Sequence, residues 1–226
     1  MSFIVAMDGP AGTGKGTITS LISKEMGLVN IDTGATYRCV TLYLIKNNIK
    51  LEEKEKIIEA LPNIHIDMKN EQGIQKVYLN GKDVTDEIRS KEVTKIVSLV
   101  SSIVEVRLAM VEIQRNLAKG KDVIMEGRDI TTYVFPNADV KIYLDADEEE
   151  RAKRRYKEMQ EKGIEMTYEE VLKNIQVRDK NDKEKEIGAL KIAEDAIYID
   201  TTNLSIEEVK EKVKEIITEK YKNKNF

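Results

Sequence analysis

A glycine-rich segment near the start of the chain has the residue types and spacing of a phosphate-binding loop, or P-loop. It comprises Gly9, Pro10, Ala11, Gly12, Thr13, Gly14, Lys15, Gly16 and Thr17. Glycines let backbone N–H groups approach phosphate oxygens, and a following helix adds the positive end of its dipole. Lys15 is expected to reach the β- and γ-phosphates of a nucleotide, and Thr17 to contact magnesium or a phosphate. Gly16 departs from the general pattern, because it separates the lysine from the threonine.

This spacing is specific for nucleotide binding but not for one activity. Chance produces the whole pattern in about one sequence in a thousand, given ordinary residue usage. A P-loop by itself leaves GTPases, motors, regulatory modules and small-molecule kinases open. The sequence contains no Asn-Lys-x-Asp motif for reading guanine, which disfavours a GTPase.

Two arginines favour a kinase, because each follows a predicted strand. Arg38 comes shortly after the strand Leu28–Ile31, and Arg128 comes after the strand Asp122–Met125. Ligands of open parallel sheets bind at the carboxyl ends of the strands. Guanidinium groups match phosphate oxygens with a rigid fork of donors. These arginines therefore suit a second phosphate, which belongs to an acceptor.

The composition excludes several other classes. The chain has 226 residues, with 37 basic against 41 acidic side chains and a net charge of −4, whereas duplex nucleic-acid binders carry a basic surplus. No apolar run approaches the roughly 20 residues of a membrane-spanning helix. A single cysteine, Cys39, excludes an internal disulfide framework, so the reducing cytoplasm is the expected location. No long apolar surface stripe stands out, so we expect a monomer.

The predicted elements alternate between strands and helices. The continuous apolar runs of the expected strands are Phe3–Met7, Leu28–Ile31, Asp122–Met125, Val140–Leu144 and Ala196–Ile199. Helical spacing or capping residues predict a helix after each of them except Asp122–Met125, which is followed by Glu126-Gly127-Arg128-Asp129. This order predicts one α/β domain over residues 1–226, with a P-loop NTPase-type parallel sheet flanked by helices.

The segment 61–90 interrupts this alternation. Ile64–Met68 and Gln75–Leu79 have the character of strands, and Asn80-Gly81 is a strong hairpin signal. A hairpin fits poorly inside a parallel repeat. We therefore predict a small antiparallel insert on the main domain.

Several motifs together resemble bacterial-type cytidylate (CMP) kinases, a family of nucleoside monophosphate kinases. They are Gly9–Thr17, Asp32–Arg38, Val77–Arg89, Glu126–Asp129 and Arg178-Asp179-x-x-Asp182, in that order. The resemblance extends from Ser2 to Ile217. It implies transfer of a phosphoryl group from ATP to CMP or dCMP with Mg²⁺, giving ADP and CDP or dCDP. It also implies that the insert 61–90 belongs to the nucleoside monophosphate (NMP)-binding region, and that residues 150–186 form a mobile, helical lid.

The resemblance also implies roles for individual side chains. Those implied to be catalytic are Lys15, Arg38, Arg128, Arg154 and Arg178, and those implied to bind the acceptor are Thr33, Arg38, Ser98, Arg107, Arg128, Asp129, Arg178 and Asp182. Arg38 and Arg128 would hold the acceptor phosphate, and Arg178 would lie near the ribose. Cytosine presents an amino donor beside ring acceptors, which an aspartate such as Asp129 and an arginine such as Arg107 can match. Uracil would place an oxygen against that carboxylate, which gives a basis for discrimination.

Other residues leave alternatives open. Arg151, Arg154 and Arg155 begin the implied lid and would approach the ATP phosphates, but the same run also fits a solvated helix with i,i+4 ion pairs. Lys185 and Thr131 stand where the family usually has arginine and glycine. Two other functions remain possible: a P-loop kinase for another acceptor, such as AMP, UMP or a polyol, and a catalytically silent nucleotide-binding module.

Overall fold

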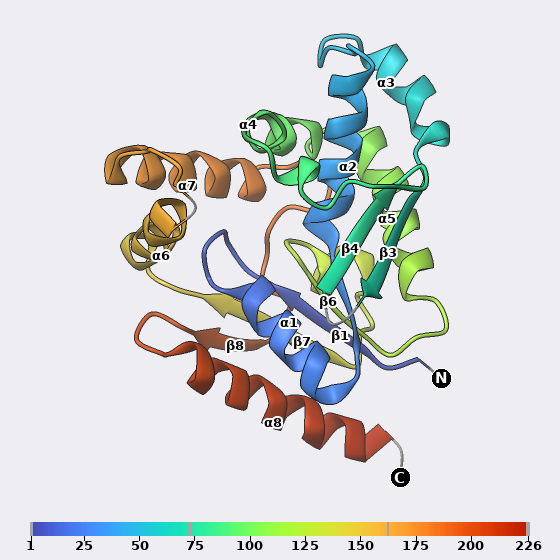
Figure 1. The fold of residues 1–226 in the computed structure, drawn as a ribbon. Coiled ribbons are helices and arrows are strands. Elements are labelled where there is room, and N and C mark those ends of the chain that lie inside the picture. The colour runs from blue at the N-terminus through green and yellow to red at the C-terminus, as the bar shows by residue number, and fades with distance from the viewer. Residues whose placement is uncertain (1, 72–73, 162, 225–226) are drawn as a thin grey trace.

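The computed structural model describes residues 2–71, 74–161 and 163–224. At its centre lies a sheet of five parallel strands in the order β2-β6-β1-β7-β8 (Figure 1). The strands are β1 (Ile4–Asp8), β2 (Val29–Asp32), β6 (Val123–Gly127), β7 (Val140–Asp145) and β8 (Ile197–Asp200). The predicted parallel α/β sheet is confirmed, and β1, which leads into the P-loop, is its central strand.

Helices cover both faces of the sheet. The helices that share an apolar core with the sheet are α1 (Lys15–Met26), α2 (Thr33–Lys46), α4 (Lys91–Val100), α5 (Val104–Ala118) and α8 (Ile206–Lys224), and two more, α6 (Glu148–Glu161) and α7 (Tyr168–Lys183), lie apart from it. Successive side chains of a strand point to opposite faces. On β1, Val5 and Met7 therefore pack in a core with α1 and α8, whereas Ala6 packs in a second core with α2 and α5. Two apolar cores thus hold the P-loop strand rigidly in place.

The small antiparallel sheet has the order β3-β4-β5. Its strands are β3 (Ile66–Glu71), β4 (Ile74–Leu79) and β5 (Lys82–Asp83). Asn80 and Gly81 join β4 to β5 with positive φ angles of 50° and 79°, as a two-residue hairpin turn requires. The predicted hairpin is confirmed. Val77 and Leu79 point into the core shared with α2 and α5, so the insert is part of the main body.

One helix was not predicted. Helix α3 (Lys54–Ala60) precedes the insert, and only Ile57 and Ala60 of its seven residues are buried. Two apolar positions in two turns give too weak a periodic signal to identify a helix from sequence.

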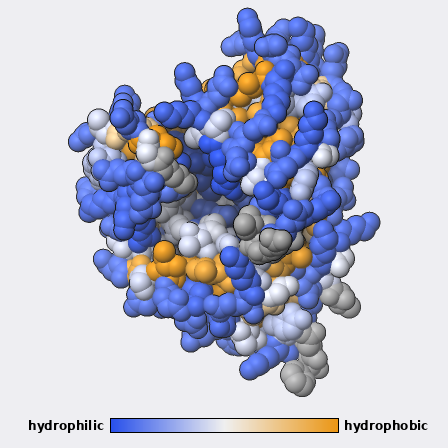
Figure 2. Space-filling view, viewed as in Figure 1, coloured by the Kyte–Doolittle hydropathy of each residue, from blue (hydrophilic) through white to orange (hydrophobic). Residues whose placement is uncertain are grey.

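Helices α6 and α7 form a pair at one side of the molecule (Figure 1). Thr167 and Glu170 make the predicted capping box at the start of α7. The pair has a small apolar core of its own, built from Ala152, Val171 and Ile175 and separate from the two cores beside the sheet. Figure 2 shows the surface hollowed beside this pair, with hydrophilic side chains within the hollow.

Among the described helices, none combines the length and apolar character needed to cross a bilayer.

Candidate active site

The P-loop wraps around the ammonium group of its own lysine. Lys15 Nζ donates hydrogen bonds to the carbonyl oxygens of Gly9 and Pro10, at 2.7 and 2.6 Å, and lies 3.2 Å from Thr13 Oγ1. Gly9 has a φ of +148°, and a Cβ on it would lie 2.0 Å from the carbonyl oxygen of Leu144. Only glycine therefore fits where the loop leaves β1.

The surroundings of Lys15 disfavour its charged form. Burial and the charges of Arg128 and Arg178 hold the pKa of Lys15 well below its ordinary range, although Glu126 and Asp8 act in the opposite direction. A phosphate group beside these cations would supply the missing negative charge. The loop is thus organised for an anion.

The predicted arginines converge on the same place. Arg128 follows β6, and its Nε lies 2.8 Å from Asp182 Oδ2, while Arg178 Nε lies 4.0 Å from the same oxygen. Arg38 extends from α2 and is oriented by hydrogen bonds from its Nη1 to Ile88 O at 3.2 Å and Thr94 Oγ1 at 2.9 Å. Three elements thereby bring three guanidinium groups to the carboxyl edge of the sheet.

Positive charge exceeds negative charge in this cluster. Partial burial and the neighbouring Arg128 lower the pKa of Arg178 to about 10. Burial likewise lowers the pKa of Arg38, although Asp32 opposes that shift. Burial disfavours a charged Asp182, but Arg128 and its other basic neighbours nevertheless lower the pKa of this carboxyl. One carboxylate shared among several cations leaves them able to bind phosphate oxygens.

Beside the arginine cluster lies a buried polar cluster, formed by side chains of α5 and the loop after β6 next to the end of α4. Arg107 Nη2 and Asp129 Oδ2 form an ion pair, and both side chains are at most 5% exposed. The guanidinium also donates to Ser101 O at 3.1 Å and lies 5.4 Å from the centre of the Tyr37 ring. Burial raises the pKa of Asp129, while Arg107 opposes this shift.

Arg107 Nε lacks a hydrogen-bond partner within the described ranges, and so do Tyr37 Oη and Ser98 Oγ. All three atoms are buried. Unpaired buried polar atoms are costly unless a ligand or water binds them. The structure pairs Arg107 with Asp129 and leaves Ser98 Oγ buried without a partner, and the base-reading role of these three residues stays a prediction. Thr33 lies nearby, but its hydroxyl donates to Glu126 O at 2.6 Å.

The residues near the first turn of α1 fit a hydrated magnesium ion. Thr17 is exposed there, and Glu126 Oε1 lies 2.8 Å from the place that a Cβ of Gly16 would take. Asp32 and Glu126 are neighbours in register on β2 and β6, and burial together with Asp32 raises the pKa of Glu126 to about 7. Among the described residues no group of three or more ligating side chains occurs. Such a site suits an ion that keeps most of its waters.

The lid arginines differ from what was expected. Arg154 donates to the carbonyl oxygens of Thr201 and Thr202, at 2.6 and 3.2 Å, and to Glu150 on its own helix. Arg155 Nη1 pairs with Glu158 Oε2 on the same helix at 2.6 Å, and its charge adds to the effect of burial, which is the main cause of the lowered pKa values of Arg38 and Arg178. The catalytic role predicted for Arg154 thus stays a prediction without a contact that favours it. Arg155 was expected in the lid together with Arg151 and Arg154, but the sequence could not tell Arg154 from Arg155, because only the rotation of α6 about its axis distinguishes the two.

Arg151 is anchored at the junction of α6 and the P-loop. Its Nη1 lies 2.6 Å from Asp179 Oδ2 on α7 and donates to Ala11 O at 3.0 Å. A movement of α6 and α7 would therefore change the contact of Arg151 with the P-loop.

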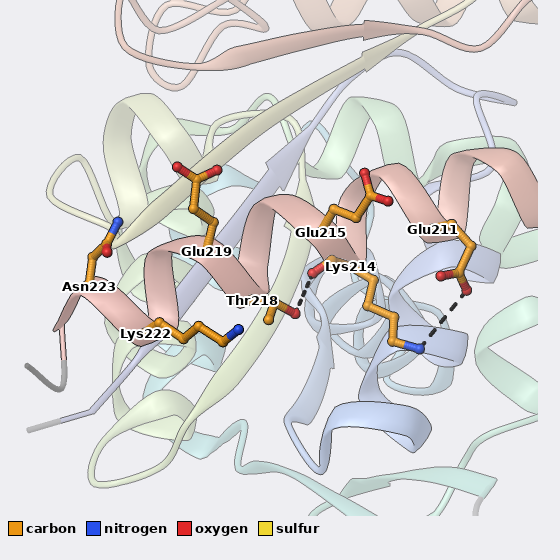
Figure 3. Close-up of a pocket in the computed structure, with 7 residues that line it drawn as sticks. All are labelled: Glu211, Lys214, Glu215, Thr218, Glu219, Lys222 and Asn223. Atoms are coloured by element: carbon orange, nitrogen blue, oxygen red, sulfur yellow. Dashed lines mark hydrogen bonds and ion pairs between the residues drawn. The ribbon is translucent and has the colours of Figure 1, made fainter.

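A second hollow lies along α8 (Figure 3). All seven residues that line it belong to that helix: Glu211, Lys214, Glu215, Thr218, Glu219, Lys222 and Asn223. Lys214 contacts Glu211 on the same helix at 4.0 Å and pairs with Glu25 of α1 at 2.6 Å. A site needs groups that converge from several elements, so this hollow is no candidate.

Comparison with known proteins identifies the family. The sequence profile of the cytidylate kinase family matches residues 5–219. The chain belongs to the cytidylate kinase family. It is 53% identical over 212 residues to a cytidylate kinase of Caldicellulosiruptor saccharolyticus, which covers 94% of both chains. It is 51% identical to a cytidylate kinase of Fusobacterium nucleatum, over 92% of this chain and 94% of that one.

A solved structure supports the fold. An uncharacterized protein from Eubacterium ventriosum superposes with a TM-score of 0.51, covering 97% of this chain and 99% of that chain. The sequence identity is 11%, so this likeness concerns the fold alone.

Both departures from the usual pattern of cytidylate kinases are accommodated in the site. Lys185 Nζ lies 2.7 Å from Asp182 Oδ1, so the lysine still joins the charged cluster. Thr131 Oγ1 donates to Asp8 Oδ2 at 2.6 Å, and the Thr131 side chain is buried. Neither residue displaces Asp129 from its pairing with Arg107.

Gly188, in the segment between α7 and β8, lies against the Arg107–Asp129 pair and was not identified from the sequence. A Cβ at this position would lie 2.1 Å from Arg107 Nη2 and 2.2 Å from Asp129 Oδ2. Its φ of +65° also favours glycine. No sequence motif marks this position.

We expect Gly188→Ala to lower the free energy of unfolding and to disturb the Arg107–Asp129 pair. The added methyl group collides with a buried ion pair, so the free energy of unfolding should fall by about 1–3 kcal/mol, as in other overpacked sites. Gly120→Ala is the matched control, since Gly120 has a φ of +74° with open space around its Cβ position. Urea denaturation of both variants measures the difference. Equal losses in the two variants would show that the collision has no cost.

Proposed function

We propose that the protein transfers the γ-phosphoryl group of ATP to CMP or dCMP, giving ADP and CDP or dCDP. One observation carries the choice of acceptor: the buried Arg107–Asp129 pair, with the unpartnered Ser98 Oγ, lies beside the arginine cluster. Cytosine offers an amino donor to the carboxylate and ring acceptors to the guanidinium. Its phosphate would then reach the arginines at the edge of the sheet.

On the donor side, the P-loop would hold the ATP phosphates. Lys15 would leave the carbonyl oxygens of Gly9 and Pro10 and bind the β- and γ-phosphates, where its charged form is favoured. Thr17 would contact Mg²⁺ directly, with Glu126 and Asp32 acting through water. The ion would supply positive charge that neutralises the phosphate oxygens.

On the acceptor side, Arg38 and Arg128 would hold the CMP phosphate, and Arg178 would lie near the ribose. Asp182 would orient these groups and contact the ribose. In the reaction an oxygen of the CMP phosphate forms a bond to the γ-phosphorus, while the bond to the bridging oxygen of ADP breaks. The acceptor is already anionic, so no protein nucleophile is needed, and positioning with charge neutralisation supplies the rate.

Residues 150–186 would act as a lid and residues 61–90 as part of the NMP-binding region. The separate apolar core of α6 and α7 supports movement of that pair as a unit. Arg155 lies on α6 beside Arg154 and would move with it, and its charge adds a small part, after burial, to the lowered pKa values of Arg38 and Arg178. Closure would exclude water, which otherwise accepts the phosphoryl group.

An acceptor panel tests this proposal. ADP production from Mg-ATP is measured with CMP, dCMP, UMP, AMP and a polyol, each separately, and without acceptor. We expect CMP and dCMP to give kcat/KM values at least about tenfold above the others, because a mismatched base leaves buried polar groups unpaired. A higher value for AMP or UMP would reject the base assignment, and no stimulation by any acceptor would reject a nucleotide kinase.

A further inference from the structure

Asp8 is a buried acid that the proposed reaction does not use. It ends the central strand β1, directly before the P-loop, and is fully buried. Its carboxylate accepts three hydrogen bonds: Oδ1 from Ile130 N at 2.9 Å, and Oδ2 from Thr131 N at 2.7 Å and Thr131 Oγ1 at 2.6 Å. All three donors belong to the loop that carries Asp129.

Through these bonds, Asp8 caps a helical turn that lies far from it in the sequence. Ile130–Val134 forms the one-turn π-helix η3, and Asp129 occupies its N-cap position. An aspartate at an N-cap commonly accepts hydrogen bonds from the first backbone N–H groups with its own side chain. Asp129 makes no such bond, and its carboxylate pairs with Arg107 instead. Asp8 satisfies the first two N–H groups of the turn in its place.

We propose that Asp8 and Thr131 are positioning residues for cytosine selectivity: by capping η3 they leave the Asp129 carboxylate free for Arg107 and the base. The inference rests on the proposed function, in which Asp129 reads cytosine. Without the external cap, the Asp129 side chain is the nearest acceptor for the N–H groups of η3. A carboxylate that turns back to cap its own helix no longer faces the base.

Thr131 makes the cap stronger in this chain than a glycine could. A glycine at this position would keep the backbone N–H bond to Asp8 but would lack the hydroxyl. The hydroxyl supplies the third donor to a buried carboxylate, and hydrogen bonds to charged groups are among the strongest in proteins.

The test compares acceptor selectivity in two variants. Thr131→Val removes only the hydroxyl donor and keeps the shape, the backbone bonds and the charge of Asp8. Asp8→Asn keeps the shape but replaces one acceptor oxygen by a donor. KM and kcat are measured for CMP and UMP, together with KM for ATP, well below the unfolding temperature. We expect each variant to raise KM for CMP about tenfold and to lower the CMP-to-UMP ratio of kcat/KM about tenfold, as loss of a charge-assisted hydrogen bond predicts.

Two controls separate positioning from general damage. Thr131→Ser keeps the hydroxyl and should restore the CMP-to-UMP ratio, whereas Thr132→Val, one position along η3, should leave it unchanged. KM for ATP should change less than about twofold in Thr131→Val, because the variant leaves the P-loop intact.

The outcomes distinguish this inference from the proposed function. Asp129→Asn is measured in parallel. If it removes the preference for CMP while Thr131→Val and Asp8→Asn retain it, the positioning role is wrong and the proposed function stands. If Asp129→Asn itself retains the preference, the base assignment fails, and the inference fails with it. Should Asp8→Asn not fold, Thr131→Val and Thr131→Ser decide.

Discussion

Replacing Lys15 by alanine is expected to lower kcat by about three orders of magnitude, the size of effect seen when a main electrostatic contact to a transferring group is lost. Lys15 is buried in the P-loop beside Arg128 and Arg178, and its pKa is well below the ordinary range until negative charge arrives. Its interaction with phosphate should therefore strengthen as charge develops during transfer. Alanine has no charged group that could make this interaction.

The measurement is steady-state turnover of Mg-ATP with CMP, together with circular dichroism to verify the fold. Lys24→Ala is the matched control, because Lys24 lies in the last turn of the same helix and is exposed. It should retain normal turnover. Turnover close to normal in the Lys15 variant would refute the assignment of the P-loop.

Replacing Arg128 by methionine is expected to lower kcat/KM for CMP by about 100- to 1000-fold. Methionine retains much of the apolar volume but no charge. The variant loses a phosphate-binding fork and also removes a partner of Asp182, whose carboxylate is 2.8 Å from Arg128 Nε. Leaving a buried carboxylate with fewer cations is destabilising. Loss of activity and loss of stability must therefore be separated.

Two further variants make that separation. Adding Asp182→Asn to Arg128→Met removes the carboxylate that lost its partner, so stability should recover while activity stays low. Arg128→Lys keeps the charge but not the fork and should retain part of the activity. If the double variant regained normal kcat/KM, Arg128 would have only a structural role. Thermal unfolding and kinetics with CMP provide both readouts.

Much of the fold followed from local patterns in the sequence. The buried strand before the P-loop, the Asn80-Gly81 hairpin and the Thr167–Glu170 capping box depend on residues close together in the chain. Backbone preferences act over the same short range, so they can be recognised in a single sequence. The short helix α3 was missed because its apolar face has only Ile57 and Ala60.

The candidate site divides in the same way. Gly9–Thr17 form the P-loop as one local motif, and the motifs shared with cytidylate kinases indicated which arginines to expect. The sequence could not determine that Asp8 caps the turn after Asp129, since Ile130 and Thr131 are 122 and 123 positions from Asp8. It could not place Gly188 against the Arg107–Asp129 pair either.

The lid arginines give the physical reason. Arg154 and Arg155 are adjacent in sequence, but neighbouring residues on an α-helix point about 100° apart. Packing of α6 against α7, through Ala152 and Val171, fixes the rotation of the helix. That rotation directs Arg154 to Thr201 and brings the charge of Arg155 to bear on Arg38. The sequence determined which charged groups are present, and tertiary packing decided which of them meet, because side-chain direction depends on contacts distant in the chain.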